Sequence, residues 1–501
     1  MPLRESLAAA VGQDNVLADE AACRYASSDI FVWPDAVVAE LVVRPASTAE
    51  TAAAVSLLSQ ENIVPRGAGL SYTAGVVPQA PAVVVDTARM QAIDIHADDL
   101  YAVVGAGCTW EKLAAALKPH GLQAVQRSPI SGSHSTVGGL ASQNLPGGMD
   151  GVIGLTVVLA DGTVARTGSA ARADASAFQR YSGPDLTGLF LGDCGAFGIK
   201  TEVVLRLAPE PVAAFASFGF NDGEALVGTI AELMRRGLVS RAFAMDAAKG
   251  AAASRVEAGE AAKILGAVVK GAGSIGQAMK DVAQLARGRN VLHEHPWSLH
   301  LTVEAATEAG AAAQLDLVRN QVQAREIDNV VPKTLRAKPY SIRGLVGPDG
   351  ERWVPVHGVL PLSRARACMA DLRAHIESNA AALQGAGVTA QWLVSSAGPY
   401  VTIEPMFYWR DALDPIQLAH LSERNRARFA GSPENEPARE LVRRMRAELR
   451  DVFGRHGAVH AQIGRFYRFT ELMDPGSREL LARMKRALDP EGRMNPGSLG
   501  L

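Results

Sequence analysis

Three clusters of glycine, serine and threonine interrupt the apolar segments of the first 200 residues, and they constrain the fold more than any other feature. They lie at 65–75, 131–154 and 183–198, and a fourth Gly/Pro-rich run, LDPEGRMNPGSLGL, ends the sequence. Glycine permits backbone conformations and close approaches that a side chain forbids. Successive backbone N–H groups in such loops can converge on an anion. Each cluster therefore predicts either an ordinary structural turn or a loop that approaches an anion such as a pyrophosphate.

Short β-branched segments between these clusters predict strands at 39–43, 82–86, 101–105, 152–159 and 199–207. A capping box at Ser47–Glu50 opens a helix to about 60, and a second helix is expected at 110–120. Asp161-Gly162 predicts a tight turn. No GxGxxG joins a first strand to a helix, so this is not a dinucleotide fold of the Rossmann kind.

The composition changes after Pro209 and Pro211 to long Ala/Leu/Arg-rich segments, which predict helices at 304–323 and 363–383. Strands are expected between them, at 298–303, 358–361 and 401–406. The Ala-rich stretch at 247–263 is interpreted as a surface helix or a loop. A second α+β domain is therefore expected.

Charge and cysteine content narrow the function classes. Fifty Lys+Arg against 52 Asp+Glu give a net charge of −2, so no basic field favours nucleic acid. No window of 18 uncharged apolar residues predicts a membrane span, and the first residues, MPLRESLAAAVGQDNV, do not form a secretory signal. Four widely spaced cysteines favour reduced thiols. We expect a cytoplasmic protein.

Four motifs along the chain contain the residues expected to contact a ligand. The loop segments are Arg66-Gly67-Ala68-Gly69-Leu70-Ser71, Pro129, Thr136 to Ser142 with Gly138 and Gly139, Gly195 to Ile199 with Gly198, and Asn495. In this order and spacing they resemble the vanillyl-alcohol oxidase / p-cresol methylhydroxylase superfamily of FAD-linked oxidases, over about 36–211 and 454–501.

The resemblance implies an α+β protein with a PCMH-type FAD-binding fold and a substrate cap. Its domains would be an FAD-binding domain at 1–211, a cap at 212–450 and a segment returning to the FAD domain at 451–501. The pyrophosphate of FAD would lie on the 66–73 loop and on Thr136–Ser142, with Pro129 nearby. Gly195, Gly198 and Ile199 would pass near the adenine or the isoalloxazine, and Asn495 would approach the ring.

The resemblance also bears on how FAD is held. Many relatives attach the flavin to a histidine of the first loop, where this sequence has Leu70. Others use a histidine or tyrosine of the cap, and that position corresponds to Val401, with Tyr400 beside it. Noncovalent FAD is therefore expected.

Two branches of the family suggest different substrates. In the 4-alkylphenol branch, tyrosines and an arginine bind a phenolate oxygen, and Tyr72, Tyr467 and Arg468 stand at matching positions. Such donors stabilise the negative charge that drives hydride loss from the benzylic carbon. That branch also has an aspartate where this chain has Ile130. His134 is then either the base or an ordinary loop histidine.

The second branch oxidises D-2-hydroxy acids with a metal held by an HxxGDGNxH-type run, which this sequence lacks. The nearest segments are His293-Glu294-His295 and His456 to His460, without a third ligand at a recognisable spacing. No metal is therefore expected. Cations for a carboxylate are available in the cap, at positions Arg343, Arg364 and Arg410.

Phe407, Tyr408 and Trp409 follow one another in a chain with 5% aromatic residues. On a strand, Phe407 and Trp409 would share one face and could line a site for a flat aromatic substrate with Arg410, or pack in the core. The preferred hypothesis is an FAD-dependent oxidation of a para-hydroxylated aromatic alcohol or alkylphenol. D-2-hydroxy-acid dehydrogenase and an inactive flavin-binding subunit are alternatives. The electron acceptor would be O₂, a protein or a quinone, and a homodimer is expected.

Overall fold

The computed structural model describes residues 3–254, 295–337, 339–340 and 345–501. Its contacts divide the chain into two compact units. Unit 1 comprises Met1–Glu210, Leu413–Ser422 and Ala461–Leu501, and unit 2 comprises Pro211–Ala412 and Glu423–His460. These bounds differ from the expected domains in two places. Residues 413–422, expected in the cap, belong to unit 1, and the returning segment begins at 461 instead of 451.

Unit 1 contains two sheets. The first has the order β1-β2-β4-β3, in which β2, β4 and β3 are parallel and β1 is antiparallel. The second is antiparallel, in the order β5-β6-β10-β8-β9, with β7 also paired to β10. The strands are β1 Val16–Leu17, β2 Leu41–Val43, β3 Ile63–Arg66, β4 Val83–Asp86, β5 Ile93–His96, β6 Tyr101–Gly105, β7 Leu122–Ala124, β8 Val152–Val158, β9 Val164–Arg166 and β10 Ile199–Pro209.

The helices of unit 1 include the C-terminal one. They are α1 Leu3–Val11, α2 Glu20–Ala26, α3 Thr48–Leu57, α4 Trp110–Leu117, α5 Val137–Gln143, α6 Leu186–Phe190, α15 Pro415–Ala419 and α18 Pro475–Leu488. The tail after α18 pairs with β3, because Ile63 and Met494 form a parallel bridge. Lys485 of α18 ties this helix to the segment before β10, because its Nζ donates a hydrogen bond to the Ala196 carbonyl at 2.7 Å. Both ends of the chain therefore build one unit.

The core of unit 1 explains why these elements form. Leu7 of α1, Val55 of α3, Ile63 of β3 and Val158 of β8 are fully buried in one cluster. Ser47 caps α3 by accepting a hydrogen bond from the Glu50 amide, as the sequence predicts. The strands expected at 39–43, 82–86, 101–105, 152–159 and 199–207 are confirmed as β2, β4, β6, β8 and β10.

Unit 2 is built on an eight-stranded sheet in the order β14-β11-β13-β12-β17-β18-β15, with β16 paired to β18. All of its pairs are antiparallel. The strands are β11 Val212–Phe220, β12 Arg241–Asp246, β13 Trp297–Ala305, β14 Arg325–Ile327, β15 Arg352–Pro355, β16 Gly358–Pro361, β17 Thr389–Ser396 and β18 Tyr400–Trp409.

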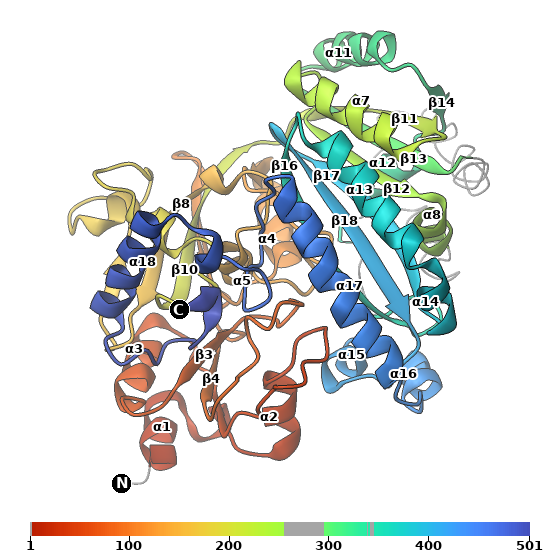
Figure 1. Ribbon diagram of the computed structural model, residues 1–501. Helices are drawn as coiled ribbons and strands as arrows, with labels where there is room; N and C mark the ends of the chain where they lie inside the picture. Colours follow the sequence, from red (N-terminus) through yellow and green to blue (C-terminus); the bar gives the residue numbers. More distant parts are fainter. Residues whose placement is uncertain (1–2, 255–294, 338, 341–344) are drawn as a thin grey trace. The chain divides into compact units, whose positions relative to one another are not determined.

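Unit 2 also contains helices, several of which contact this sheet. They comprise α7 Gly223–Arg235, α11 Glu308–Gln321, α13 Ala365–Ser378, α14 Ala380–Gly385 and α17 Glu436–Arg455, with shorter α8 Ala247–Ser254, α12 Val330–Ala337 and α16 Glu423–Phe429. Figure 1 shows α7, α13 and α17 running along the sheet beside β18. The expected long helices are confirmed as α11 and as α13 with α14. The rest of the Ala-rich stretch, from 255 to 263, lies outside the described residues.

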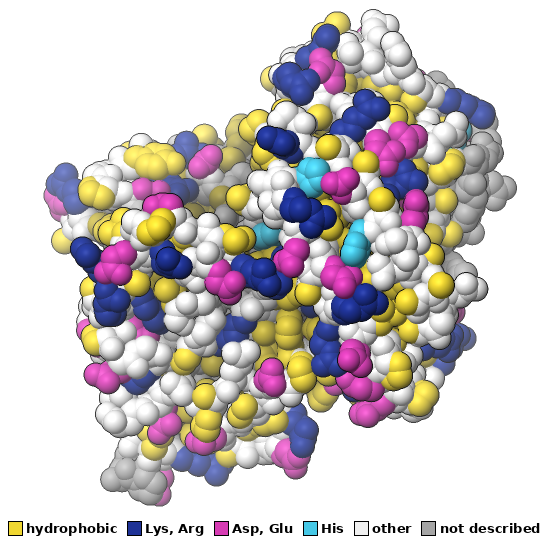
Figure 2. All heavy atoms as spheres, in the orientation of Figure 1, with side chains coloured by type: hydrophobic (Ala, Val, Ile, Leu, Met, Phe, Trp, Pro, Cys, Tyr) yellow, Lys and Arg dark blue, Asp and Glu magenta, His cyan; other side chains and the backbone are white. Residues whose placement is uncertain are grey.

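The surface is consistent with the nearly balanced charge. Figure 2 shows acidic and basic side chains interspersed over the visible face of the molecule. No helix in the ranges that the structure describes is long and apolar enough to cross a membrane.

Candidate functional site

The first glycine-rich loop leaves β3 at Arg66, whose side chain is buried beneath it. Nη1 of Arg66 donates hydrogen bonds to the carbonyls of Ala26 (2.9 Å) and Ser28 (2.8 Å). Burial lowers the pKa of Arg66. Gly69 has φ +72°, and a Cβ there would collide with the guanidinium. This loop therefore needs glycine at 69 both for its backbone conformation and for space.

The second loop packs against the first. Thr136 caps α5 by accepting a hydrogen bond from the Gly139 amide at 3.1 Å. A Cβ at Gly67 would lie 2.6 Å from Thr136 Oγ1, and one at Gly138 would lie 2.6 Å from the Ala106 Cβ. The glycines of 66–71 and 136–142 thus allow the two loops to meet at backbone distance.

The third loop, which contains Cys194 and Gly195, contacts both the second loop and the end of β3. The Ser142 carbonyl accepts a hydrogen bond from the Cys194 amide at 2.9 Å. Gly195 has φ +78°, and a Cβ there would lie 3.1 Å from the Pro65 ring. Gly198 precedes β10, which begins at the buried Ile199. Three distant segments of sequence therefore converge in unit 1.

Asn495 holds these loops together. Its Nδ2 donates to the carbonyls of Gly75 (2.8 Å) and Cys194 (2.6 Å), and its Oδ1 accepts from Nη2 of Arg465 (2.8 Å). Both of its amide N–H groups thus donate to the protein itself, and its expected approach to the flavin ring stays a prediction. Its role in the structure is to fasten the C-terminal tail to the first and third loops.

Several buried polar atoms of unit 1 have no hydrogen-bond partner among the residues described. They include Arg66 Nη2, Thr73 Oγ1, Gln126 Oε1, His420 Nε2 and Gln462 Oε1. Buried polar atoms are almost always hydrogen-bonded in folded proteins, so such a group signals a ligand or water. Together with the glycine-lined meeting of the loops, these atoms fit a large ligand with many polar groups, as FAD is.

The C-terminal segment that carries the candidate phenol-binding residues lies on the first loop. The Arg465 amide donates to the Thr73 carbonyl at 2.8 Å. Tyr72 and Tyr467 are both buried, with exposed fractions of 7% and 4%. The structure thus brings together the two segments in which the sequence placed these tyrosines, although they are almost 400 residues apart.

Arg468 and its neighbour Arg465 have different surroundings. The Arg468 side chain is 46% exposed and lies 3.6 Å from the Glu471 carboxylate. Arg465 is held by backbone carbonyls, including those of Val77 (2.9 Å) and Pro496 (2.7 Å). Burial lowers the pKa of Arg465 to about 10. The sequence analysis did not identify Arg465. Its only signal in the sequence is its position after Gly464 and shortly before Tyr467 and Arg468.

His134 lies against a residue that the sequence did not single out. The ring centroids of His134 and His420 are 4.4 Å apart, with the rings at 67°. His420 follows α15, and both histidines belong to unit 1. Ile130, at the position of the missing aspartate, is 36% exposed.

The aromatic residues of β18 are core residues of unit 2. Phe407 and Trp409 are 0% and 1% exposed and lie on one face of the strand. Tyr408 points to the other face, near Met406 and Leu393. The expected alternation is confirmed. The expectation that Phe407 and Trp409 line a substrate site is wrong, because their complete burial leaves no surface for a ligand.

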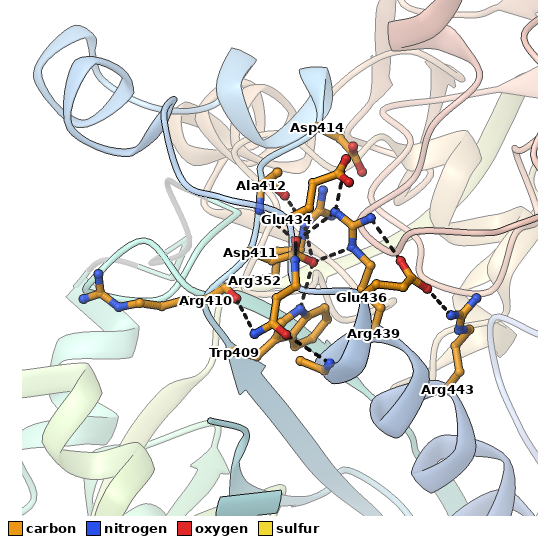
Figure 3. A network of polar contacts seen from close by, with 12 residues as sticks. Arg352, Trp409, Arg410, Asp411, Ala412, Asp414, Glu434, Glu436, Arg439 and Arg443 are labelled. Atoms are coloured by element: carbon orange, nitrogen blue, oxygen red, sulfur yellow. Dashed lines mark hydrogen bonds and ion pairs between the residues drawn. The ribbon is translucent and has the colours of Figure 1, made fainter. Parts of the chain in front are cut away.

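A buried ion network follows β18. Asp411 accepts hydrogen bonds from Arg439 (2.8 Å from both Nε and Nη2), the Trp409 indole (2.9 Å) and the Asn435 amide (2.9 Å). Figure 3 shows these donors converging on Asp411, while the Arg410 side chain points away from them. Arg410 is exposed, and only its carbonyl joins the network, by accepting from Asn435.

This network fixes the end of unit 2 where the chain enters the segment 413–422. Nε of Arg352 donates to the Ala412 carbonyl at 2.6 Å. Burial would raise the pKa of Asp411, but the hydrogen bonds from Arg439 and Trp409 outweigh it and lower the pKa. Asp411 is therefore a fixed anion within unit 2.

The other residues considered for carboxylate or metal binding do not assemble a site. His460 Nδ1 contacts the His357 carbonyl at 2.8 Å, and His456 pairs with Asp371 at 2.7 Å. Arg364 is exposed at the start of α13. Among the described residues, no three His, Cys, Asp or Glu side chains form a possible metal site. His293, Glu294 and Arg343 lie outside the described residues.

Comparison with known proteins agrees with this architecture. Residues 39–168 match the family model described as FAD binding domain. Glycolate oxidase subunit GlcD of Bacillus subtilis is 35% identical over 190 residues, covering 36% of this chain and 38% of the relative. D-lactate dehydrogenase of Archaeoglobus fulgidus is 29% identical over 201 residues, covering 38% and 43%. The chain thus matches less than half the length of these relatives.

A solved structure extends the likeness to the whole chain. p-Cresol methylhydroxylase with substrate bound has a TM-score of 0.74 at 17% identity, covering 100% of this chain and 96% of that one. At this identity, the likeness establishes the fold. The matched FAD-binding domain, the convergence of the glycine loops and the two-unit fold agree with the resemblance of the motifs. Residues 39–168 therefore match an FAD binding domain, and the chain as a whole shares the fold of p-cresol methylhydroxylase.

Proposed function

We propose that this protein is an FAD-dependent oxidoreductase that removes a hydride from a benzylic or allylic carbon of a para-hydroxylated aromatic alcohol or alkylphenol. The observation that carries the proposal is the hydrogen bond between the Arg465 amide and the Thr73 carbonyl, at 2.8 Å. It places the segment of Tyr467 on the segment of Tyr72, and both tyrosines are buried.

The proposed roles follow from the chemistry of a phenol. Tyr72 and Tyr467 hydroxyls donate hydrogen bonds to the phenolate oxygen, and Arg468 supplies a positive charge. The phenolate takes the place of the Glu471 carboxylate beside Arg468. Ionised phenol donates electron density through the ring, which weakens the benzylic C–H bond. FAD, when bound, supplies the two-electron acceptor.

The proposed FAD site consists of the 66–71 loop, the 136–142 loop with Pro129, and Gly195 to Ile199. Binding is noncovalent, because Leu70 cannot bond the ring and the cap position Val401 is apolar and fully buried. Acid precipitation is expected to release all flavin into the supernatant. Flavin that stays with the pellet would contradict this.

A second candidate is oxidation of D-2-hydroxy acids. The partial sequence matches to proteins named glycolate oxidase subunit and D-lactate dehydrogenase favour it. A third candidate, which involves no catalysis, is a flavin-binding subunit that has lost activity.

Anaerobic bleaching of the flavin absorption band separates the three candidates. The holoenzyme is mixed with 4-hydroxybenzyl alcohol, with 4-ethylphenol or with a panel of D-2-hydroxy acids. The proposal predicts bleaching by the two phenols. Bleaching by hydroxy acids alone supports the second candidate, and bleaching by neither class supports the third.

The cellular setting is also proposed. The four cysteines are buried and unbridged, which suits a reducing cytoplasm. A homodimer is proposed by analogy with the family and is tested by light scattering on a sizing column. Reoxidation of the reduced flavin by O₂, compared with a quinone or a cytochrome, identifies the electron acceptor in the proposed catabolism of aromatic compounds.

A further inference from the structure

The segment 413–422 carries α15 into unit 1 and fixes it near the first loop. Asp414 and Gln417 form a capping box at the start of α15. Nε2 of the buried Gln417 donates to the Ile30 carbonyl at 2.8 Å. The Ile30 amide in turn donates to the Ser71 carbonyl at 2.9 Å. Two hydrogen bonds thus link α15 to the residue directly before Tyr72.

His420 comes directly after α15 and meets His134 edge to face, at 4.4 Å between ring centroids. Its Nε2 is buried and has no hydrogen-bond partner in the described part of the chain. Leaving a buried polar atom without a partner costs about 1–3 kcal/mol, so a bound group is expected to contact it. A nitrogen of a neutral imidazole can accept or donate a proton.

The surroundings keep His420 uncharged. Burial lowers its pKa to about 4, and the neighbouring His134 and the Arg66 guanidinium act in the same direction. His134 precedes α5 and Arg66 ends β3, so the charged or titratable groups that face His420 come from these two other segments. Tyr25 and Asp29 act on Arg66 itself. At neutral pH, His420 is therefore free to accept a proton.

We propose that His420 accepts the hydroxyl proton when an alcohol is oxidised at this site, and that His134 holds its ring in position. This inference rests on the proposed function. The phenol branch has an aspartate at the position of Ile130, and in this chain His420, from another segment, would act as the base instead. The alcohol O–H bond breaks and its proton moves to Nε2 of His420. The O–H electrons form the second C–O bond, and the benzylic hydride leaves with two electrons to the bound flavin, giving the aldehyde.

Two substrates separate this role from a structural one. 4-Hydroxybenzyl alcohol has a hydroxyl that must lose its proton, whereas 4-ethylphenol has none on the reacting carbon. His420→Ala is expected to slow anaerobic flavin reduction by the alcohol on the order of 100-fold, and to leave reduction by 4-ethylphenol within about three-fold. His420→Asn, which keeps a polar side chain of similar size, gives the same contrast. The control His120→Gln changes an exposed histidine of unit 1 and leaves both rates unchanged.

Added imidazole provides a second readout. It is expected to restore alcohol oxidation in His420→Ala, because it supplies the missing base. It has no effect on His420→Asn, where the side chain fills the site. Equal loss with both substrates in His420→Ala and in His420→Asn, without rescue, would overturn the inference.

A third readout does not depend on turnover. NMR of ring-labelled histidines in the holoenzyme reports the titration of His420 in the wild type and in His134→Gln. Because His134 lowers the pKa of His420, its removal is expected to raise that pKa. An unchanged titration would show that the pair is not coupled and would contradict the inference.

The outcomes distinguish this inference from the proposed function. If neither phenol reduces the wild-type flavin, the proposed function fails, and the alcohol arm is repeated with the D-2-hydroxy acids. Loss of their oxidation in His420→Ala would then keep His420 as the base. If both phenols reduce the wild-type flavin but oxidation of 4-hydroxybenzyl alcohol is the same in His420→Ala as in the wild type, the inference alone is refuted.

Discussion

Replacing Asp411 by asparagine removes a buried negative charge that two guanidiniums of unit 2 share. Asp411 is 0% exposed, Arg352 is 1% exposed and Arg439 is 11% exposed. In Asp411→Asn, an amide N–H₂ faces the N–H groups that donate to the carboxylate in the wild type. Arg352 and Arg439 then lose this buried anion, while Arg439 keeps its pair with Glu436 at 3.3 Å, and the hydrogen bonds from Trp409 and Asn435 are weakened.

The expected loss of folding stability in Asp411→Asn is large. Removing one partner of a buried ion pair costs about 3–5 kcal/mol. Unit 2 has about 240 residues, and an unfolding entropy of about 2.1 cal/mol/K per residue gives roughly 0.5 kcal/mol/K. A loss of about 4 kcal/mol therefore lowers the melting temperature of this unit by about 8 °C.

Differential scanning calorimetry measures the change, with Asp174→Asn as the matched control. Asp174 also pairs with an arginine, Arg172, at 2.9 Å, but the two side chains are 73% and 70% exposed. Exposed pairs contribute about 0–1 kcal/mol, so the control, which lies in unit 1, is expected to shift the transition of that unit by about 2 °C at most. Similar shifts in the two variants would refute the reasoning from burial.

Three further substitutions test other parts of the structure. Gly138→Ala puts a Cβ 2.6 Å from that of Ala106, which is expected to destabilise the α5 loop by about 1–3 kcal/mol and to lower the ratio of flavin to protein absorbance after purification. Burial raises the pKa of Glu404 to about 7, so the folded state keeps a proton that the unfolded chain releases above about 4.5, and stability falls as pH rises between these values. Glu404→Gln is therefore expected to be more stable than the wild type by on the order of 2 kcal/mol at pH 8 and equal to it at pH 4, in urea titrations. Arg468→Ala is expected to lower kcat/KM for phenols by about 100-fold while FAD affinity stays unchanged, and a change of only a few-fold would argue against the phenolate site.

Local signals in the sequence predicted much of unit 1. β-Branched runs mark β4 and β8 because such residues favour a buried strand, and Ser47 with Glu50 marks the start of α3. Glycine at 67, 69 and 138 identifies the converging loops, because each position lacks space for a side chain. Strand and cap signals depend on a few neighbouring residues and can be read from the chain. The space missing at Gly67 and Gly138 is taken by Thr136 and Ala106, so the glycines mark the loops but not their partners.

Long-range packing could not be predicted in this way. The alternation of β18 gives its two faces, but not which one the helices cover, so Phe407 and Trp409 were assigned to a ligand when they pack in the core. Similarly, nothing in the composition of 413–422 indicates that Gln417 bonds to Ile30, which brings His420 into unit 1. Arg465 carries the same charge as Arg468, and only the fold makes the first partly buried and the second exposed.

The ionisation state of a bound phenol tests the central claim most directly. A chromophoric phenol that the enzyme cannot oxidise, such as 4-hydroxybenzaldehyde, is titrated into the holoenzyme at a pH below its solution pKa. If Tyr72, Tyr467 and Arg468 hold a phenolate, the bound molecule shows the phenolate absorption band, and Arg468→Ala loses that band. A bound phenol that stays protonated in the wild type, or a band that is equally strong in Arg468→Ala, would contradict the account.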